Sequence, residues 1–271
     1  MSRLASSFDR LRREGEKGFI PFITAGDPNL QTTKELLVAL GEIGATVIEL
    51  GIPFSDPMAD GPVIQRASER ALRQDFGLEA VLDVVGDARA HTEAPIILFS
   101  YFNPLLQFGI DRLSRQAQSV GIDGFLVTDL TPEEAHAVTT TFNANDLDMI
   151  FLVAPTSTDA RLEMIAHYAS GFIYAVSRRG VTGQQQDVSS EAEVLVNRVR
   201  RFLDLPVAVG FGISSSDQVA RTWQYADAAV VGSAIVAEIE KLEGHPDLVS
   251  QVIAFVQKLI PMTGPQSKTK K

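Results

Sequence analysis

Cysteine is absent from the 271-residue sequence, which also has few histidines and a single tryptophan. The lack of cysteine excludes disulfides, thiolate catalysis and cysteine-ligated metal sites. The histidines are scattered along the chain and suggest no metal site; they are His91, His136, His167 and His245.

Long hydrophobic runs are also missing. No segment approaches the roughly 18 consecutive apolar residues that a membrane-spanning helix needs, and the N-terminal residues lack the apolar core of a secretory signal. Basic residues are outnumbered, with 24 Lys and Arg against 34 Asp and Glu and a formal net charge of −10. This balance argues against a nucleic-acid or anionic-membrane surface. We therefore expect a cytoplasmic protein, which can still hold a local phosphate on backbone N–H groups.

Short apolar segments recur along the chain, and each is followed by a longer segment with the spacing of an amphipathic helix. In residues 30–45, for example, Leu36, Leu40 and Ile43 fall on one helical face, and Gly44 ends the pattern. Several apolar segments are continuous rather than alternating, which suits parallel strands buried on both faces. The predicted strands are residues 18–24, 46–50, 95–101, 124–130, 148–154, 171–177, 206–212 and 227–233.

Eight strand–helix units follow one another with no linker, so the sequence predicts an α/β fold with a parallel sheet. The count favours a single (β/α)8 TIM barrel, which commonly has about 250 residues, over a doubly wound sheet, although periodicity alone does not decide between them. We expect one barrel domain over residues 1–262, with extra short helices at the N-terminus and in βα loops 2 and 8. Residues 263–271 are expected to form a disordered polar tail.

Two carboxylates stand out. Glu49 lies near the C-terminal end of an apolar predicted strand, where it is either satisfied by neighbouring donors or is a general acid/base with a raised pKa. Asp60 follows in residues 51–77, an extended loop that breaks the strand–helix rhythm. Because Gly61 and Pro62 come next, an N-cap or turn role for Asp60 is as well supported by its position as catalysis.

Glycine-containing segments fall at the ends of predicted strands six, seven and eight, at residues 177–183, 209–217 and 230–236. Each alone is typical of any strand end. Together they match the phosphate site that TIM barrels often carry after strands seven and eight. Gly232 would let a phosphate approach closely, and Ser233 would donate at a helix N-terminus.

The segment ELGIPFSDPMADGPVIQ (residues 49–65), with FIPFITAGDP before it and GVTGQQ, VGFGIS and VVGSAIV after it, closely resembles the tryptophan synthase alpha family. The resemblance runs from about Phe8 to Ile260. It implies a TIM-barrel lyase that cleaves indole-3-glycerol phosphate to indole and glyceraldehyde 3-phosphate in tryptophan biosynthesis. It also implies an α2β2 complex with a beta subunit that carries pyridoxal phosphate, and no cofactor or metal in this chain.

The resemblance further implies roles for individual residues. Asp60 would interact with the indole N–H, Glu49 would move the protons, and Tyr174 would orient Glu49 or the substrate. The residues implied for the phosphate are Gly183, Gly212, Gly232 and Ser233. Those implied for the indole pocket, for which ordinary barrel core is the competing interpretation, are Phe22, Tyr101, Leu126, Thr182 and Phe211.

Other functions stay open. A different phosphate-binding barrel, such as a sugar-phosphate isomerase or epimerase, would share the glycine segments. The chain could also be a free-standing lyase that releases indole to solvent, or a non-catalytic activator of a beta subunit. The apolar loops that contain Phe54, Met58 and Leu106 suggest a docking surface for a beta subunit, with packing against the barrel rim as the alternative.

Overall fold

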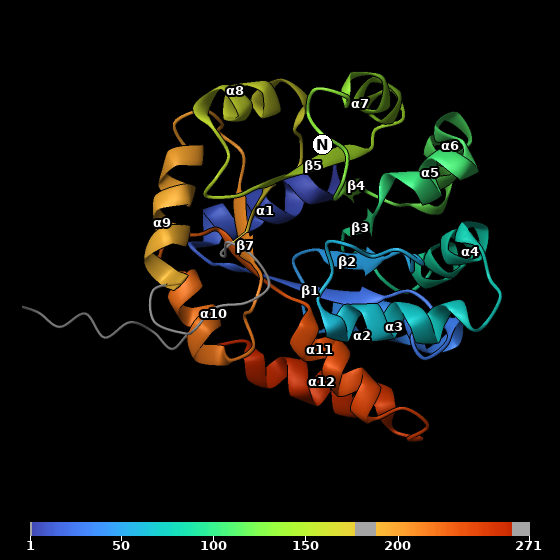
Figure 1. The fold of residues 1–271 in the computed structure, drawn as a ribbon. Helices are drawn as coiled ribbons and strands as arrows, with labels where there is room; N and C mark the ends of the chain where they lie inside the picture. Colours follow the sequence, from blue (N-terminus) through green and yellow to red (C-terminus); the bar gives the residue numbers. More distant parts are fainter. Residues whose placement is uncertain (1, 177–187, 262–271) are drawn as a thin grey trace, which may run out of the picture.

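Eight parallel strands close into a barrel in the computed structural model of the chain, which describes residues 2–176 and 188–261 (Figure 1). Each strand pairs with the next along the chain, and β1 pairs with β8 to close the ring. This confirms the predicted (β/α)8 barrel and excludes an open doubly wound sheet. The strands are β1 (Gly18–Thr24), β2 (Ile48–Gly51), β3 (Ile96–Ser100), β4 (Gly124–Val127), β5 (Asp148–Val153), β6 (Ile173–Val176), β7 (Val207–Gly210) and β8 (Ala228–Val231).

Helices surround the barrel and include the predicted extra ones, which are α1 before β1, a second helix in βα loop 2, and a second helix after β8 (Figure 1). The predicted polar tail lies outside the described residues. The helices are α1 (Arg3–Glu14), α2 (Leu30–Glu42), α3 (Pro62–Leu72), α4 (Leu78–Arg89), α5 (Phe102–Phe108), α6 (Ile110–Val120), α7 (His136–Asn143), α8 (Asp159–Tyr168), α9 (Val188–Val199), α10 (Ser216–Thr222), α11 (Ser233–Lys241) and α12 (Leu248–Leu259).

The short helix α5 was not anticipated by the sequence pattern. It occupies the apolar segment before Gly109, and Pro104 falls in its first turn, where no intrahelical N–H is needed. Gly109 has φ of 93° and separates α5 from α6. A glycine at this left-handed position lets the chain turn sharply. The apolar loop predicted around Leu106 is therefore the helix α5, and α6 follows it directly.

Helix α1 lies across one end of the barrel (Figure 1). Its buried residues Leu4, Phe8 and Leu11 pack with inward-facing strand residues and with Phe172, just before β6. The Ser7 hydroxyl donates to the Thr46 carbonyl at 2.9 Å, just before β2. Helix α1 therefore closes the end of the barrel where the strands begin, which leaves the opposite end for a site.

Side chains just before three strands fix the pairing of neighbouring strands. The Thr46 hydroxyl accepts the Phe19 N–H of β1 at 3.0 Å. The Asp123 carboxylate accepts the Ile96 N–H of β3 at 2.8 Å, and the Asp227 carboxylate accepts the Val207 N–H of β7 at 2.9 Å. These bonds tie β1 to β2, β3 to β4 and β7 to β8 at the closed end.

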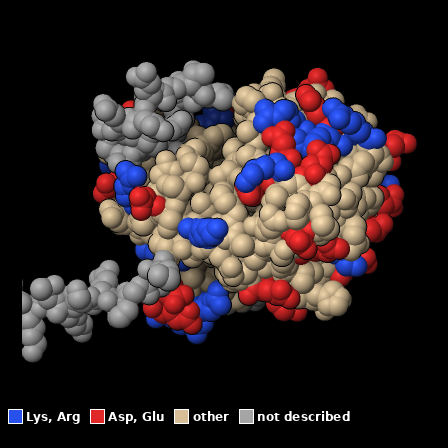
Figure 2. All heavy atoms as spheres, turned by 90° about the horizontal axis from the view of Figure 1, so that it is seen from below, with Lys and Arg blue, Asp and Glu red and all other residues tan. Residues whose placement is uncertain are grey.

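The surface carries charges of both signs. On the face seen from the side of α11 and α12, Lys and Arg side chains are interspersed with Asp and Glu rather than gathered in a basic patch (Figure 2). Such a face lacks the electrostatic footprint of a nucleic-acid site. Within the described residues, no helix has the length and apolar character needed to cross a membrane.

The packing of α1 predicts a large effect of Phe8→Ala. Phe8 is 5% exposed, and its ring centroid lies 5.6 Å from that of Phe172. Removing a buried phenyl ring commonly lowers the free energy of unfolding by about 3–5 kcal/mol. We expect the urea midpoint to fall, as measured by the fluorescence of the sole tryptophan, Trp223. Arg10→Ala, on the exposed face of α1, is the control; an equal effect of both substitutions would contradict this packing.

Candidate active site

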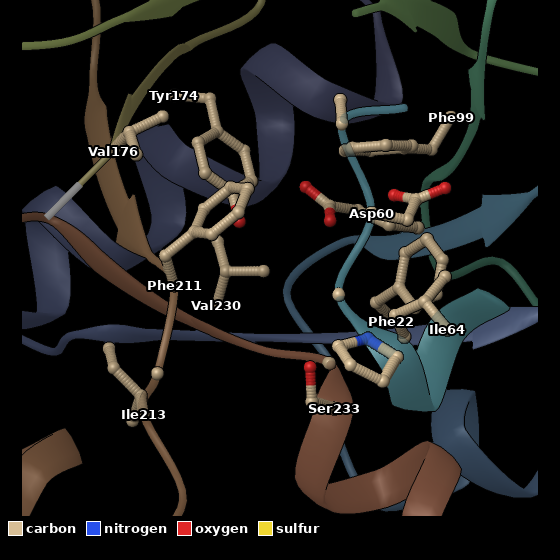
Figure 3. Close-up of a pocket in the computed structure, with 16 residues that line it drawn as sticks. Phe22, Asp60, Ile64, Phe99, Tyr174, Val176, Phe211, Ile213, Val230 and Ser233 are labelled. Atoms are coloured by element: carbon tan, nitrogen blue, oxygen red, sulfur yellow. The ribbon is translucent and has the colours of Figure 1, made fainter. Parts of the chain in front are cut away.

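The C-terminal ends of the strands open onto a cavity of about 410 Å³. Phe22, Ile64 and Phe99 lie on one side and Tyr174, Phe211 and Val230 on the other, with Asp60 between them (Figure 3). The full lining consists of Phe22, Glu49, Ala59, Asp60, Gly61, Pro62, Ile64, Phe99, Tyr174, Val176, Phe211, Gly212, Ile213, Val230, Gly232 and Ser233. An apolar cavity with a few converging polar groups is the usual form of a small-molecule site.

Glu49 is buried in this cavity. It pairs in register with Phe22 of β1 and Ile97 of β3, and it is 1% exposed. Neither carboxyl oxygen has a hydrogen-bond partner within the described part of the chain. Burial raises the pKa of Glu49 well above its ordinary value. Of the two interpretations open from the sequence, the geometry therefore favours the acid/base over the carboxylate satisfied by donors.

Asp60 lies just before α3, but the N-cap residue of that helix is Gly61, and no side chain caps it. The carboxyl group faces the cavity instead. Burial raises its pKa to about 6, and a hydrogen bond from Tyr101 opposes part of this rise. The Gln65 side-chain amide donates to the Asp60 carbonyl at 2.9 Å. Asp60 is therefore tied by its backbone to the first turns of α3.

Tyr101 lies beside the Asp60 loop rather than in the large cavity. Its hydroxyl accepts the Ala59 N–H at 2.8 Å and interacts with the Asp60 carboxyl group. It lines a neighbouring cavity of about 10 Å³ together with Thr24 and Ser68. In this structure, Tyr101 holds the loop and is not among the residues that line the predicted indole pocket.

Tyr174 and Phe211 form the opposite wall. Tyr174 is buried, and its pKa is raised well above the ordinary value by burial and by the charge of Glu49. The Phe211 ring meets it edge-on, with centroids 6.2 Å apart. Phe211 has φ of 77°, a left-handed value that is rare for a bulky side chain. This unfavourable backbone conformation places an aromatic ring at the cavity, where strained residues commonly have a function.

The N-terminus of α11 also faces the cavity. Gly232 is its N-cap residue, with no side chain that caps the helix, and Ser233 is its first residue (Figure 3). Free N–H groups and the helix dipole favour an anion at such an end. Gly212 lies nearby with φ of 78°, a conformation that favours glycine. The predicted ligands Thr182 and Gly183 fall outside the described residues.

The structure adds some lining residues to the predicted ones and leaves out two of them, Tyr101 and Leu126. Phe99, Ile64 and Val230 line the cavity and were not predicted. Phe99 is two positions before Tyr101, so strand alternation could have identified it. Leu126 is fully buried in the inner barrel cluster and does not line the cavity. Within residues 2–176 and 188–261, no group of His, Asp and Glu side chains could hold a metal ion.

Comparisons with known proteins point to one family. The family model described as tryptophan synthase alpha chain matches residues 8–263. The tryptophan synthase alpha chain of Solibacter usitatus is 46% identical over 259 residues, which cover 96% of this chain and 97% of that protein. The solved structure of tryptophan synthase subunit alpha from Legionella pneumophila has a TM-score of 0.88 at 36% identity, covering 96% and 97% of the two chains. A chain of the tryptophan synthase complex from Pyrococcus furiosus gives 0.80 at 37% identity, covering 89% and 97%.

The raised pKa of Asp60 predicts a stability that depends on pH. Its pKa is about 6 in the folded protein against an ordinary value of 3.8, so the folded state binds more protons between these values. Stability therefore falls as pH rises through this window. We expect Asp60→Asn to raise the thermal midpoint near neutral pH, and we expect the gain to shrink as the pH is lowered toward about 4.

The matched control is Asp56→Asn, at an exposed position in the same loop. Thermal scans of both variants across this pH range make the comparison. A similar gain from Asp56→Asn, or a gain from Asp60→Asn that does not depend on pH, would contradict the assignment to Asp60.

Proposed function

The chain belongs to the tryptophan synthase alpha chain family, whose alpha reaction cleaves indole-3-glycerol phosphate to indole and glyceraldehyde 3-phosphate, and we propose that Glu49 and Asp60 carry out this reaction in the cavity. The observation that carries the proposal is a pair of buried carboxyl groups with raised pKa values in an apolar cavity. The cavity also has a helix N-terminus suited to a phosphate. A sugar-phosphate isomerase would have no use for the aromatic walls.

The substrate orientation follows from the two kinds of lining. The phosphate binds at Gly212, Gly232 and Ser233, where backbone N–H groups meet the end of α11. The indole ring lies between the aromatic walls formed by Phe22 and Phe211. Thr182 and Gly183 remain predicted ligands of the pocket and the phosphate, respectively. This orientation brings the ring nitrogen to the Asp60 side of the cavity.

Proton transfer in the proposed mechanism depends on Glu49. In its neutral form, which burial favours, Glu49 gives its proton to C3 of the indole ring. The ring becomes an indolenine cation with positive charge at nitrogen, and the Asp60 carboxylate stabilises that charge. Charged Glu49 then takes the proton of the hydroxyl group on the carbon attached to C3. The bond between the two carbons breaks, its electron pair restores the indole ring, and the hydroxyl-bearing carbon becomes the aldehyde.

Tyr174 supports the change of Glu49 between its neutral and charged forms. Its hydroxyl group remains neutral, because burial and the charge of Glu49 raise its pKa. A neutral phenol beside Glu49 can donate a hydrogen bond to the charged form of that carboxyl group. We assign Tyr174 the role of orienting Glu49, and we assign no cofactor to this chain.

Substitution of either carboxylate tests the mechanism. A positioned proton-transfer group commonly contributes about 10²–10⁴ in rate. We expect Glu49→Gln and Asp60→Asn each to lower kcat for indole release by at least about 10²-fold, because both amides fit the site but carry no charge. The control is Glu42→Gln at the exposed end of α2. Near-normal turnover by either variant would remove that residue from the mechanism. Wild-type activity should also fall as the pH drops below about 6, where Asp60 becomes protonated.

The exposed apolar residues near the Asp60 loop form the proposed docking surface for a tryptophan synthase beta subunit. Met58 is 84% exposed and Leu106 is 52% exposed, and exposed apolar side chains at a barrel mouth are typical of protein interfaces. Phe54 packs on Tyr101, with ring centroids 5.3 Å apart, and Tyr101 contacts Asp60. A partner on this surface would therefore act on Asp60 through Phe54 and Tyr101. Pyridoxal phosphate belongs to that partner.

The docking surface makes a separate prediction. We expect the double substitution Met58→Ser, Leu106→Ser to weaken the binding of a tryptophan synthase beta subunit at least about tenfold and to reduce its activation of indole release. Cleavage by the isolated chain should change little. Val194→Ser, on an exposed apolar residue of α9, is the control. Unchanged affinity in calorimetric titrations of the double variant would contradict the surface. High wild-type activity without any beta subunit would favour a free-standing lyase, and loss of indole formation with retained activation a non-catalytic activator.

A further inference from the structure

Arg70 is a buried arginine that the reaction does not use. It lies on the third turn of α3, and its side chain is 10% exposed. Two of its nitrogens donate to the two oxygens of Asp27 at 2.8 and 2.9 Å. A third nitrogen donates to Glu240 of α11 at 2.7 Å. Neither Arg70 nor its partners line the cavity.

The second cation on this network is far more exposed. Arg66 lies one turn before Arg70 and forms two bonds with Glu240, at 2.7 and 2.8 Å. Its side chain is 49% exposed, and ion pairs in water contribute little to stability. Arg70 and Asp27 are nearly out of contact with water, so their paired, planar bonds fix both distance and angle.

The three elements joined by Arg70 are the ones that position the site. Asp27 follows β1, whose Phe22 lines the cavity. Glu240 is on α11, which begins at Ser233 on the proposed phosphate site. Helix α3 begins two residues after Asp60, and Gln65 ties the Asp60 carbonyl to it at 2.9 Å. A shift of α3 would therefore move Asp60 relative to both the aromatic wall and the phosphate.

A second contact also links the end of α3 to the segment after β1. After α3, the Gln74 side-chain amide donates to the carbonyls of Gly26 and Pro28, at 2.7 and 2.6 Å. These residues flank Asp27, so Gln74, just after α3, holds the segment after β1 on both sides of the carboxylate. Hydrophobic packing would fill this space without the desolvation of the Arg70 and Asp27 charges. The charged network instead fixes the orientation of α3 relative to β1 and α11.

We infer that Arg70 is a positioning residue, which sets the location of Asp60 relative to the phosphate site by fixing α3 against β1 and α11. The inference rests on the proposed function. Misplacement of a catalytic group by about 1 Å can lower a rate by about 10²-fold. Loss of Arg70 should thus impair cleavage although Arg70 touches neither substrate nor a reacting atom.

Three variants separate positioning from folding. Arg70→Met removes the bonds from α3 to Asp27 and Glu240 and leaves Asp27 as an unpaired buried charge, so it should lower both stability and kcat. Asp27→Asn combined with Arg70→Met removes that buried charge but does not restore the bonds from α3 to the segment after β1 and to α11. Arg70→Lys keeps a positive charge but loses the two-bond geometry. Arg66→Met, which removes the exposed arm on Glu240, is the matched control.

Indole release from indole-3-glycerol phosphate is measured as a function of pH, per folded molecule, at a temperature where each variant is folded. We expect Arg70→Lys and the double variant to regain thermal stability relative to Arg70→Met. Both should still lose kcat by at least about tenfold. In both, the fall in activity near pH 6 should also shift, because Asp60 has moved. Arg66→Met should keep wild-type kcat and the wild-type pH profile.

Two results would overturn the inference. If the double variant regains both kcat and the wild-type pH profile, Arg70 only prevents a buried charge from destabilising the fold. If Arg66→Met loses as much activity as Arg70→Lys, the effect comes from Glu240 at the surface. A wild-type protein that fails to release indole would overturn the proposed function instead, which is a different outcome.

Discussion

Closure of the barrel by hydrogen bonds between β1 and β8 is the constraint on which the site depends. In a closed parallel barrel all C-terminal strand ends meet at one rim, and alternate residues of every strand point inward. Glu49 of β2 and Tyr174 of β6 thus face one cavity although they are far apart in the sequence. Helix α1 fills the other end with Phe8 and its neighbours, so only the rim with the loops remains open.

The same closure also sets the environment of Glu49. A barrel interior is apolar, and the described residues offer the Glu49 carboxyl group no donor. Its charged form is therefore unfavourable, and its pKa rises. The pKa of Asp60 is raised less, because Asp60 is less buried and Tyr101 donates a hydrogen bond to it. Two carboxyl groups with different environments can therefore take different roles at one pH, one as proton donor and the other as charge stabiliser. Burying these carboxyl groups lowers the stability of the fold, a cost that is common where a site is built for activity.

Local patterns in the sequence predicted the barrel, because the apolar segments and the helices between them repeat along the chain. They also marked Glu49 as a candidate, because it is a carboxylate within an apolar predicted strand. Asp60 required the family resemblance, since the residues Gly61 and Pro62 after it equally suit a turn. Strand alternation applied to β3 would have found Phe99, whereas the hydrogen bonds of the Tyr101 hydroxyl depend on where the next loop folds. The Arg70 network could not be predicted in this way. Its partners Asp27 and Glu240 are 43 and 170 positions away, and only the closed ring of helices brings them together.

The Asp60 loop is consequently held in different ways at its C-terminal end and in its middle. Its C-terminal end joins α3, which Arg70 fixes against β1 through its buried pair with Asp27 and against α11 through its pair with Glu240. Its middle, at Met58, is exposed to solvent and is linked to the barrel mainly through the Ala59 N–H on Tyr101. A partner that docked at Met58, as proposed, would thus act on the weakly held part of the loop. It would adjust the Asp60 carboxyl group while α3 and the proposed phosphate site at Ser233 stay in place, because Arg70 holds α3 against both β1 and α11.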